Sequence, residues 1–591
     1  MGRQISSFCS IRGPVSNSFL VFFPEFAAPK SAMNPISGYL SFSTLSPLSD
    51  ATASTTSEGP LAATPSTRTV SVLGWVLLLL FAALSWILRA PAMLTRQDDA
   101  RYLGLARALR MGTYRDIMWP GAPWHHMYPP GFPAILAIWT TLFGERFDGL
   151  IVLQIALSTA ALAFTFLFLR RVVSRRVSIL SAAMLALSPL FILRAGLVGS
   201  ENALALCICV AVWASVSMPR GRAQTALLIT MAVVAPLMRS VGVALTAALA
   251  LHWLLDRRYR DLSVLLVVAA IAIGSVTIWT FSDPNPLPGS SYAGDIALVG
   301  HHGERASSNV LARIGRRAVY NIAAYLTTSV PLLLSMPRFN ATTVLDVVGS
   351  TLFSLALIIG LFRWGKSNRL ASLTFVATAA ILAMWPYQDT RFLIPVVPLL
   401  IPLVLIGLDG IVRYGFRPTA SSVVLTACAG VLVVTALAAD VKSLRKASGC
   451  KRGESMPGSP CLSPDQDSFF RASRFVRDSL PRDARILSAK SEPLYFYSGH
   501  ITVPTALTLS LDSTTFWSEL ERDGAAYILL GALHSSEVRM LAPRLQAHCS
   551  ALDVVATFPP HTYLLQIVAQ PVQPGRACAA IADYRRTAAV L

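Results

Sequence analysis

The chain has 591 residues, of which 54% are hydrophobic and only 14% are charged, and its mean hydropathy is +0.56. This composition argues against a soluble protein, because a water-soluble chain of this length does not need so much apolar sequence. The formal charge of +19 would suit a nucleic-acid-binding protein. However, Lys and Arg fall in short clusters between apolar runs, which is the pattern of membrane proteins and argues against a nucleic-acid partner.

The first 68 residues are rich in Ser, Thr, Ala and Pro and show no sustained periodicity. We expect a disordered cytoplasmic tail here, or a start codon assigned too early. The segment is a poor signal peptide, because basic, apolar and cleavage regions do not follow one another in it.

Residues 69–440 are predicted to form an α-helical polytopic membrane domain. Apolar runs of roughly 17–25 residues match the thickness of a bilayer core, and we count about 11 of them. The predicted spans are 70–90, 148–169, 177–195, 200–217, 224–238, 241–255, 262–281, 343–362, 370–386, 391–410 and 421–440. With a cytoplasmic N-terminus, all the basic clusters between spans fall on the cytoplasmic side.

Two further apolar stretches, Gly131–Gly144 and Tyr320–Met336, would break this alternation if they crossed the membrane. The first is short for a span, and the second contains Pro331. We therefore expect both to be juxtamembrane helices on, or dipping into, the outer face.

Residues 441–591 have the composition of a small soluble α/β domain, which this topology places outside the cytoplasm. The segments DARILSAK and AAYILLG read as buried strands, and DSFFRASRFVRDSL and SSEVRMLAPRLQAHC as amphipathic helices.

The cysteines fall into two groups. Those in apolar segments are expected to be small core residues, namely Cys207, Cys209 and Cys428. Those in the C-terminal region allow three pairings into two disulfides, and they are Cys450, Cys461, Cys549 and Cys578. Cys450 with Cys461 is the local choice. No spacing of Cys and His suggests a zinc site.

The stretch from Arg96 to Pro133 carries the strongest functional signal. It belongs to the first outer loop, residues 91–147, and opens with the adjacent carboxylates of Asp98 and Asp99. Acidic residues at the mouth of a membrane helix are costly and often functional. One carboxylate would accept a proton from an acceptor, and the pair would hold a divalent cation such as Mg²⁺ or Mn²⁺. The alternative is that they cap the helix that follows.

The same loop contains His125, His126 and Tyr128, followed by Pro129-Pro130-Gly131. A histidine there would ligate a metal or bind phosphate, and the alternative is a polar loop residue. Adjacent side chains in an extended loop diverge, so the two histidines would rarely share one metal. The Pro-Pro-Gly turn is expected to position the loop.

Two later residues are candidates for substrate binding. Glu201 lies at the outer start of a span, where it would face the site or cap a helix behind Ser200. Arg391 would bind the oxygens of a phosphate, although it would equally pair with Asp389 or reach the membrane interface. Arg194 and Arg239 are weaker candidates for the phosphate, and nothing decides the role of His301 and His302.

The segment QDDARYLGLARALRMGTY, followed by YPPGFPAILAIWTTLFG, resembles the first outer loop of the C-type membrane glycosyltransferases. The resemblance is to the protein O-mannosyltransferase and lipid A aminoarabinose transferase group, or glycosyltransferase family 39-like enzymes. SENALAL and QDTRFLIPVVPLL are similar to later motifs of that family, so the resemblance covers about residues 70–440. Where relatives often carry Glu-Lys-Pro or Asp-His-Pro-Pro, this chain has Met127-Tyr128-Pro129-Pro130.

The resemblance implies transfer of a sugar from a polyprenyl-phosphate carrier to a protein, lipid or glycan acceptor at the outer face. It implies that Asp98 is the base or a metal-site residue, that Asp99 matches the second acidic position, and that Arg101 and Tyr102 match the Arg-Tyr of the lipid A enzymes. The predicted location is a bacterial inner membrane. A flippase for polyprenyl-linked sugars and a cell-envelope assembly scaffold remain alternatives. Against a flippase, the chain shows no internal repeat.

Overall fold

A computed structural model describes residues 67–89, 97–282, 291–292, 310–336, 343–415, 418–448, 462–504, 513–531, 533, 540–573 and 575–588. Nearly all of the predicted tail lies outside these residues, as do most of residues 282–318, including His301 and His302, and the cysteines Cys450 and Cys461.

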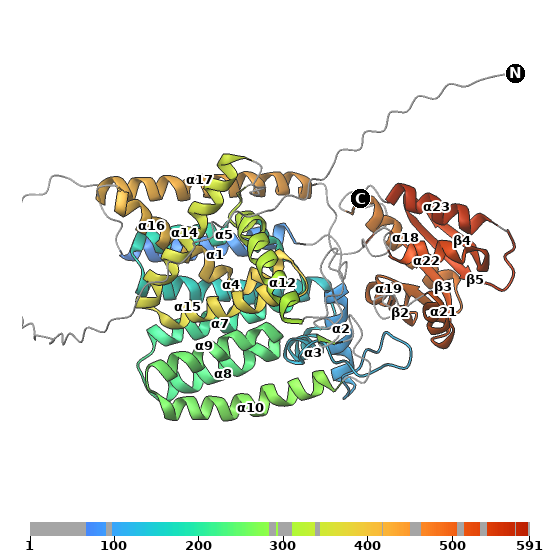
Figure 1. The fold of residues 1–591 in the computed structure, drawn as a ribbon, viewed down its shortest axis with the longest axis horizontal. Coiled ribbons are helices and arrows are strands. Elements are labelled where there is room, and N and C mark those ends of the chain that lie inside the picture. The colour runs from blue at the N-terminus through green and yellow to red at the C-terminus, as the bar shows by residue number, and fades with distance from the viewer. Residues whose placement is uncertain are drawn as a thin grey trace, which may run out of the picture. The chain divides into compact units, whose positions relative to one another are not determined.

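Most of the described chain before residue 449 is a bundle of apolar helices (Figure 1). The helices are α1 (Thr67–Ile87), α4 (Phe147–Val172), α5 (Arg175–Ala186), α6 (Pro189–Ala195), α7 (Ser200–Ser217), α8 (Arg222–Met238), α9 (Val243–Leu255), α10 (Tyr259–Phe281), α14 (Val344–Ser367), α15 (Arg369–Met384), α16 (Val397–Gly415) and α17 (Pro418–Ser448). α4 packs on α7, α7 on α8, and α14 on α16.

Six helices in the described part are long and apolar enough to cross a membrane, and the bent pair α5 and α6 would make a seventh. The other four predicted spans coincide with α1, α8, α9 and α15, which are shorter apolar helices. The chain is thus a multi-pass membrane protein, while the number of eleven spans stays a prediction.

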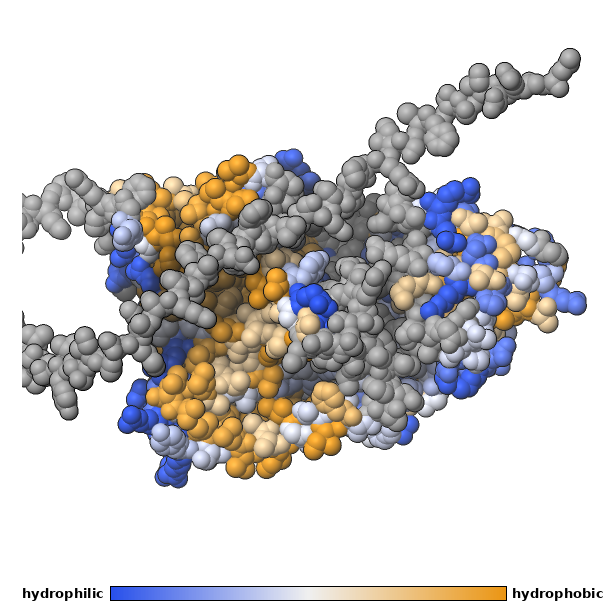
Figure 2. All heavy atoms as spheres, in the orientation of Figure 1, coloured by the Kyte–Doolittle hydropathy of each residue, from blue (hydrophilic) through white to orange (hydrophobic). Residues whose placement is uncertain are grey.

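The surface of the bundle is apolar where it would meet lipid. Figure 2 shows hydrophobic side chains spread over the visible side of the bundle. Ile271 and Ile278 of α10 are 70% and 74% exposed, and Phe362 of α14 is 75% exposed. Exposed apolar area of this extent is stable in contact with acyl chains rather than water. Cys428 also lies exposed on α17, contrary to the expectation of a core residue.

The predicted span 177–195 is broken in two. α5 and α6 meet at an angle of 58° around Ser188. Pro189, at the first turn of α6, has no N–H to continue the hydrogen bonding of α5. The bend is followed by the segment 196–199 and by α7, which both line the site described below.

The first outer loop consists of α2 (Gln97–Arg110), a segment without long elements, and α3 (Gly131–Phe143). α2 packs on α3 and lies at one end of the bundle in Figure 1. The second predicted juxtamembrane helix begins ten residues earlier than expected. It comprises α12 (Val310–Ala324), the π-helical turn η2 (Tyr325–Ser329) and the short α13 (Val330–Leu333). That both regions lie on the outer face stays a prediction.

The region after residue 461 contains a five-stranded mixed sheet in the order β2-β1-β3-β5-β4. Its strands are β1 (Arg485–Ser488), β2 (Thr502–Pro504), β3 (Ala525–Leu530), β4 (Leu552–Phe558) and β5 (Thr562–Ile567), with β1 parallel to β2 and β3. The accompanying helices are α18 (Pro464–Ser479), α19 (Ser491–Ser498), α21 (Ser513–Arg522), α22 (Ala542–Ala547) and α23 (Arg576–Ala588). The two predicted strands are β1 and β3.

A disulfide joins Cys549, just before β4, to Cys578 of α23. The predicted boundary of this region at residue 441 falls inside α17, which continues to Ser448. A soluble domain outside the cytoplasm stays a prediction.

Candidate active site

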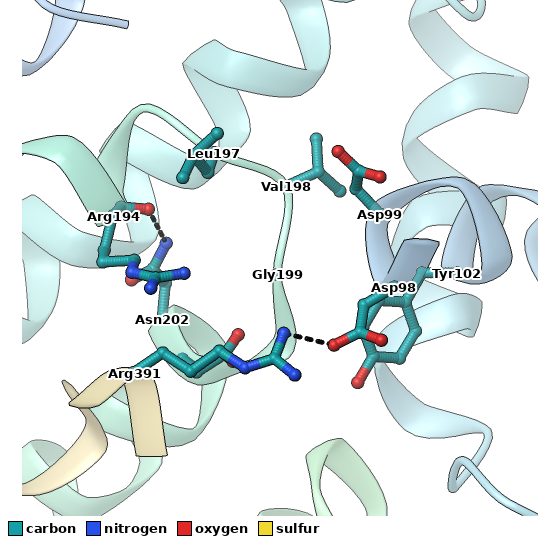
Figure 3. A pocket seen from close by; sticks show the side chains of 10 residues that line it. Asp98, Asp99, Tyr102, Arg194, Leu197, Val198, Gly199, Asn202 and Arg391 are labelled. Carbon is teal, nitrogen blue, oxygen red and sulfur yellow. Dashed lines mark hydrogen bonds and ion pairs between the residues drawn. The ribbon is translucent and has the colours of Figure 1, made fainter. Parts of the chain in front are cut away.

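A cavity opens where the first turn of α2 faces the α6–α7 connection and the 3₁₀ helix η3 (Thr390–Val396) (Figure 3). Ten residues line it: Asp98, Asp99, Tyr102, Arg194, Leu197, Val198, Gly199, Glu201, Asn202 and Arg391. Five of the predicted site residues are among them, although they come from three distant parts of the sequence.

Asp98 sits in the first turn of α2 between a cation and a hydroxyl. Its Oδ2 pairs with Nη1 of Arg391, and its Oδ1 accepts a hydrogen bond of 2.8 Å from the hydroxyl of Tyr128. Burial alone would raise the pKa of Asp98, but Arg391 and Tyr128 outweigh it and hold the pKa at about 2. Burial raises the pKa of Tyr128 well above its usual range, so its hydroxyl remains a donor. Asp98 is therefore an ionised carboxylate at neutral pH.

Asp99 is more buried than Asp98 and points elsewhere. It is 4% exposed, and Figure 3 shows its carboxylate turned toward Val198, away from Arg391. Among the described residues no group of three His, Cys, Asp or Glu side chains is arranged to hold a metal ion. Because Asp98 already binds Arg391 and Asp99 diverges from it, the predicted divalent-cation site does not fit these side chains.

Arg391 pairs with Asp389, as its sequence context allowed, in addition to Asp98. Asp389 caps η3 by accepting from the backbone N–H of Arg391 at 2.9 Å, and its Oδ2 lies 3.0 Å from Nε of Arg391. Arg194 of α6 also reaches Asp389, at 3.7 Å. The Asp389 ion pair therefore orients the guanidinium of Arg391 toward Asp98 rather than competing with it.

A second ion pair adjoins the cavity. Nη1 of Arg239 lies 3.0 Å from Glu201 and donates to Ser200 at 3.0 Å, while the hydroxyls of Ser200 and Tyr102 are 2.8 Å apart. α8 ends at Met238, so Arg239 leaves the helix at this point. Glu201 thus lies in the first turn of α7 and lines the cavity, while the N-cap position of α7 is Gly199, which has no side-chain cap.

Four predicted site residues do not line the cavity. Tyr128 reaches it only through its hydrogen bond to Asp98, and the other three are Arg101, His125 and His126. Arg101 lies 3.7 Å from Asp116 and 3.4 Å from Glu492 of α19. His126 hydrogen-bonds the carbonyl oxygen of Trp279 at 2.7 Å. These contacts hold the loop in place, so the structure gives the three side chains a loop-stabilising role, and their part in substrate binding stays a prediction.

His125 is almost fully buried and saturated by protein partners. Its Nε2 accepts the backbone N–H of Tyr128 at 2.7 Å, so Nδ1 carries the proton and donates to Asp116 at 3.0 Å. Burial lowers the pKa of His125, which is consistent with this neutral tautomer. Neither ring nitrogen is left to bind a metal or phosphate.

Sequence reasoning missed two participants. Asn202 lines the cavity and donates to the carbonyl oxygen of Arg194 at 3.2 Å, and it follows the Ser-Glu pair that did attract attention. Asp116 is 3% exposed and binds His125. A carboxylate flanked by Arg115 and Ile117 in a loop carries no sequence signal that it is buried.

Comparisons with known proteins bear on the fold that carries this site. Residues 127–279 match the family model of dolichyl-phosphate-mannose-protein mannosyltransferase. The structure of ArnT from Cupriavidus metallidurans in the apo state has a TM-score of 0.52 and 15% identity, covering 84% of this chain and 99% of that one. The chain has the fold of the C-type membrane glycosyltransferases.

Two other structures share this C-type fold. ArnT from Cupriavidus metallidurans bound to undecaprenyl phosphate has a TM-score of 0.51 and 16% identity, covering 85% of this chain and 99% of that one. The oligosaccharyltransferase AglB from Archaeoglobus fulgidus, in complex with an inhibitory peptide and a dolichol-phosphate, has a TM-score of 0.50 and 12% identity, covering 87% and 78%. No curated protein sequence matches the chain. The predicted resemblance is confirmed.

Proposed function

We propose that this chain transfers a sugar from a polyprenyl-phosphate carrier to an acceptor at the extracytoplasmic face of the membrane. The observation that carries the proposal is the ion pair of Asp98 with Arg391 in a cavity between the loop after α1 and the membrane helices. A glycosyl transfer needs a base for the acceptor and a cation for the leaving phosphate, and this pair supplies both. The fold and the family match point to the same class of reaction.

The donor phosphate would replace Asp98 as the partner of Arg391. A guanidinium binds phosphate oxygens in pairs, and Arg194 and Arg239 add positive charge nearby. As Arg391 turns to the phosphate, Asp98 loses the cation that lowers its pKa and becomes a stronger base. Donor binding would thus activate the carboxylate.

In the transfer, an acceptor hydroxyl or amine attacks the anomeric carbon, and its proton passes to Asp98. The bond between the anomeric carbon and the phosphate oxygen breaks, and the polyprenyl phosphate leaves with the electron pair. Arg391 stabilises the charge that grows on the leaving oxygen. No step requires a metal ion. Asp99 and Tyr102 would bound the sugar site, with Glu201 and Asn202 on its opposite side.

The acceptor is a protein, lipid or glycan group, and the membrane is the bacterial inner membrane with residues after α17 outside the cytoplasm. The basic residues of the connections between spans support this orientation. A flippase for the lipid-linked sugar would use the same cations to bind the phosphate, but its transport step would not need the carboxylate of Asp98 beside Arg391.

The test is sugar transfer from synthetic polyprenyl-phosphate donors in proteoliposomes, with a cell-envelope extract as acceptor. Asp98→Asn keeps the size of the side chain but cannot take the proton, so we expect the rate to fall by about 10²- to 10⁴-fold. Asp261→Asn is the matched control. It removes a carboxylate that pairs with Arg258 and that does not line the cavity.

Undiminished transfer by Asp98→Asn would refute the role of Asp98. If wild type and Asp98→Asn both move the donor between the leaflets and neither transfers sugar, the flippase is favoured. Repeating the assay with a chelator tests whether a divalent cation is needed. Loss of transfer on chelation would mean that a metal ion takes part and is bound by side chains other than the Asp98–Asp99 pair.

A further inference from the structure

A continuous series of contacts runs from the C-terminal region to Asp98. Glu492 of α19 lies 3.4 Å from Nε of Arg101, and Arg101 lies 3.7 Å from Asp116. Asp116 binds His125, whose Nε2 accepts the N–H of Tyr128. The hydroxyl of Tyr128 then donates to Asp98 at 2.8 Å. Each step is short, and the two ends are 394 positions apart in the sequence, from Asp98 to Glu492.

The charged members of this series are buried. Glu492 is fully buried, Asp116 is 3% exposed and Arg101 is 5% exposed. One guanidinium is shared between two carboxylates, so losing either carboxylate changes the position of Arg101. Breaking a buried pair by removing one partner is costly, because the remaining charge is left uncompensated. Arg101 also lies over the ring of Trp119, with its Cζ 4.3 Å from the centroid.

Other contacts near the Glu492–Arg101 pair also join the C-terminal region to the loop 111–130 and α2. The backbone N–H of Thr502 in β2 donates to the carbonyl oxygen of Met118 at 3.0 Å. The guanidinium of Arg107 lies over the ring of Phe496, 4.4 Å from its centroid. Glu492 is the one charged residue of α19, whereas Phe496 contributes an aromatic ring to the same contact.

We propose that Glu492 is a positioning residue for the transfer: through Arg101, Asp116 and His125 it holds the loop 111–130 in the conformation that places the Tyr128 hydroxyl on Asp98. The C-terminal region then contributes to the rate without touching the substrate. The effect on transfer rests on the proposed function, whereas the effect on the loop does not.

The first measurement is independent of activity. Glu492→Gln keeps the shape of the side chain and removes its charge, so Arg101 is expected to shift toward Asp116. Amide hydrogen exchange of peptides within 111–130 should then be faster than in the wild type, and Glu492→Asp should restore part of the protection. Glu519→Gln, which removes a carboxylate paired with Arg522 on α21, should leave this exchange unchanged. Unchanged exchange in Glu492→Gln would overturn the proposal.

The second measurement separates positioning from general stability. In Glu492→Gln we expect kcat to fall on the order of 10- to 100-fold with little change in the KM for donor, because the base is misplaced while the phosphate site remains. In a Tyr128→Phe background, which lacks the hydroxyl on Asp98, Glu492→Gln should have little further effect.

Full additivity of the two changes would mean that Glu492 does not act through Tyr128 and would overturn the proposal. If the wild type transfers no sugar from any donor, the proposed function fails, while the exchange measurement still decides whether Glu492 controls the loop.

Discussion

Asp98 illustrates how a single residue acquires its properties from distant partners. Its place in the first turn of α2 was predictable, since acidic residues favour helix N-termini. Its pKa was not, because Arg391 lies 293 positions away and Tyr128 lies in another part of the loop. The same applies to His125, which looked available in the sequence and is fully engaged in the structure.

Removing the cation from Asp98 should change the pH dependence of transfer. The pKa of Asp98 is about 2, so the wild-type kcat/KM should show no loss from Asp98 protonation until the pH falls toward that value. In Arg391→Gln only weaker partners counteract the effect of burial on the pKa of Asp98, so this pKa rises. The loss of kcat/KM on the acidic side of the pH profile, its acidic limb, should then begin at a higher pH. Arg391→Lys keeps a cation and should shift the limb less. The measurement is kcat/KM for donor as a function of pH, and coincident acidic limbs would contradict the assigned ion pair.

At the scale of elements, close packing of helices depends on glycine at specific crossings. On α16, a Cβ added at Gly407 would lie 1.7 Å from the carbonyl oxygen of Ala356 on α14. On α14, a Cβ at Gly360 would lie 2.0 Å from the carbonyl oxygen of Leu403. Small residues let membrane helices approach backbone to backbone. The two glycines therefore fix the approach of α16, the helix that directly follows η3 and Arg391.

Gly407→Ala should destabilise the bundle, because backbone rather than a flexible side chain occupies the space. We expect a loss of roughly 1–3 kcal/mol, typical of overpacking, together with reduced transfer as η3 shifts. Gly274→Ala on α10 is the matched control, since nothing lies within 4 Å of the added Cβ. The melting temperatures of the two variants are measured by thermal unfolding in detergent. Equal melting temperatures for the two variants would show that α14 and α16 are not in this close contact.

At the scale of the whole molecule, the protein combines an apolar helical bundle with a mixed α/β region. The two are coupled by α19 and β2, which contact α2 and the loop 111–130. The sheet buries its own cluster of apolar side chains with α21, α22 and α23, including Ile528, Leu565 and Ile581. This region therefore has a core separate from that of the bundle.

The disulfide should stabilise that separate core. It closes a loop with a sequence separation of 29 between Cys549 and Cys578, for which loop entropy predicts roughly 3.6 kcal/mol. The double variant Cys549→Ser/Cys578→Ser should become more susceptible to proteolysis within 513–588, while digestion of α4 and α7 stays unchanged. Limited proteolysis of the full chain with mass spectrometry measures this. Equal cleavage rates in wild type and variant would show that the bond adds nothing to the stability of the region.

By itself the sequence determined the membrane class, the positions of most helices, two of the five strands and the acidic start of the first outer loop. These follow from constraints that act locally, namely the thickness of the bilayer, the 3.6-residue and two-residue periods, and the preference of carboxylates for helix N-termini. The tertiary structure decided the break between α5 and α6, the pairing of Asp98 with Arg391 and of Arg101 with Glu492, and the engagement of His125. Those features depend on which buried charges find partners across hundreds of residues, and a charge removed from water takes whichever partner the packed helices bring within reach.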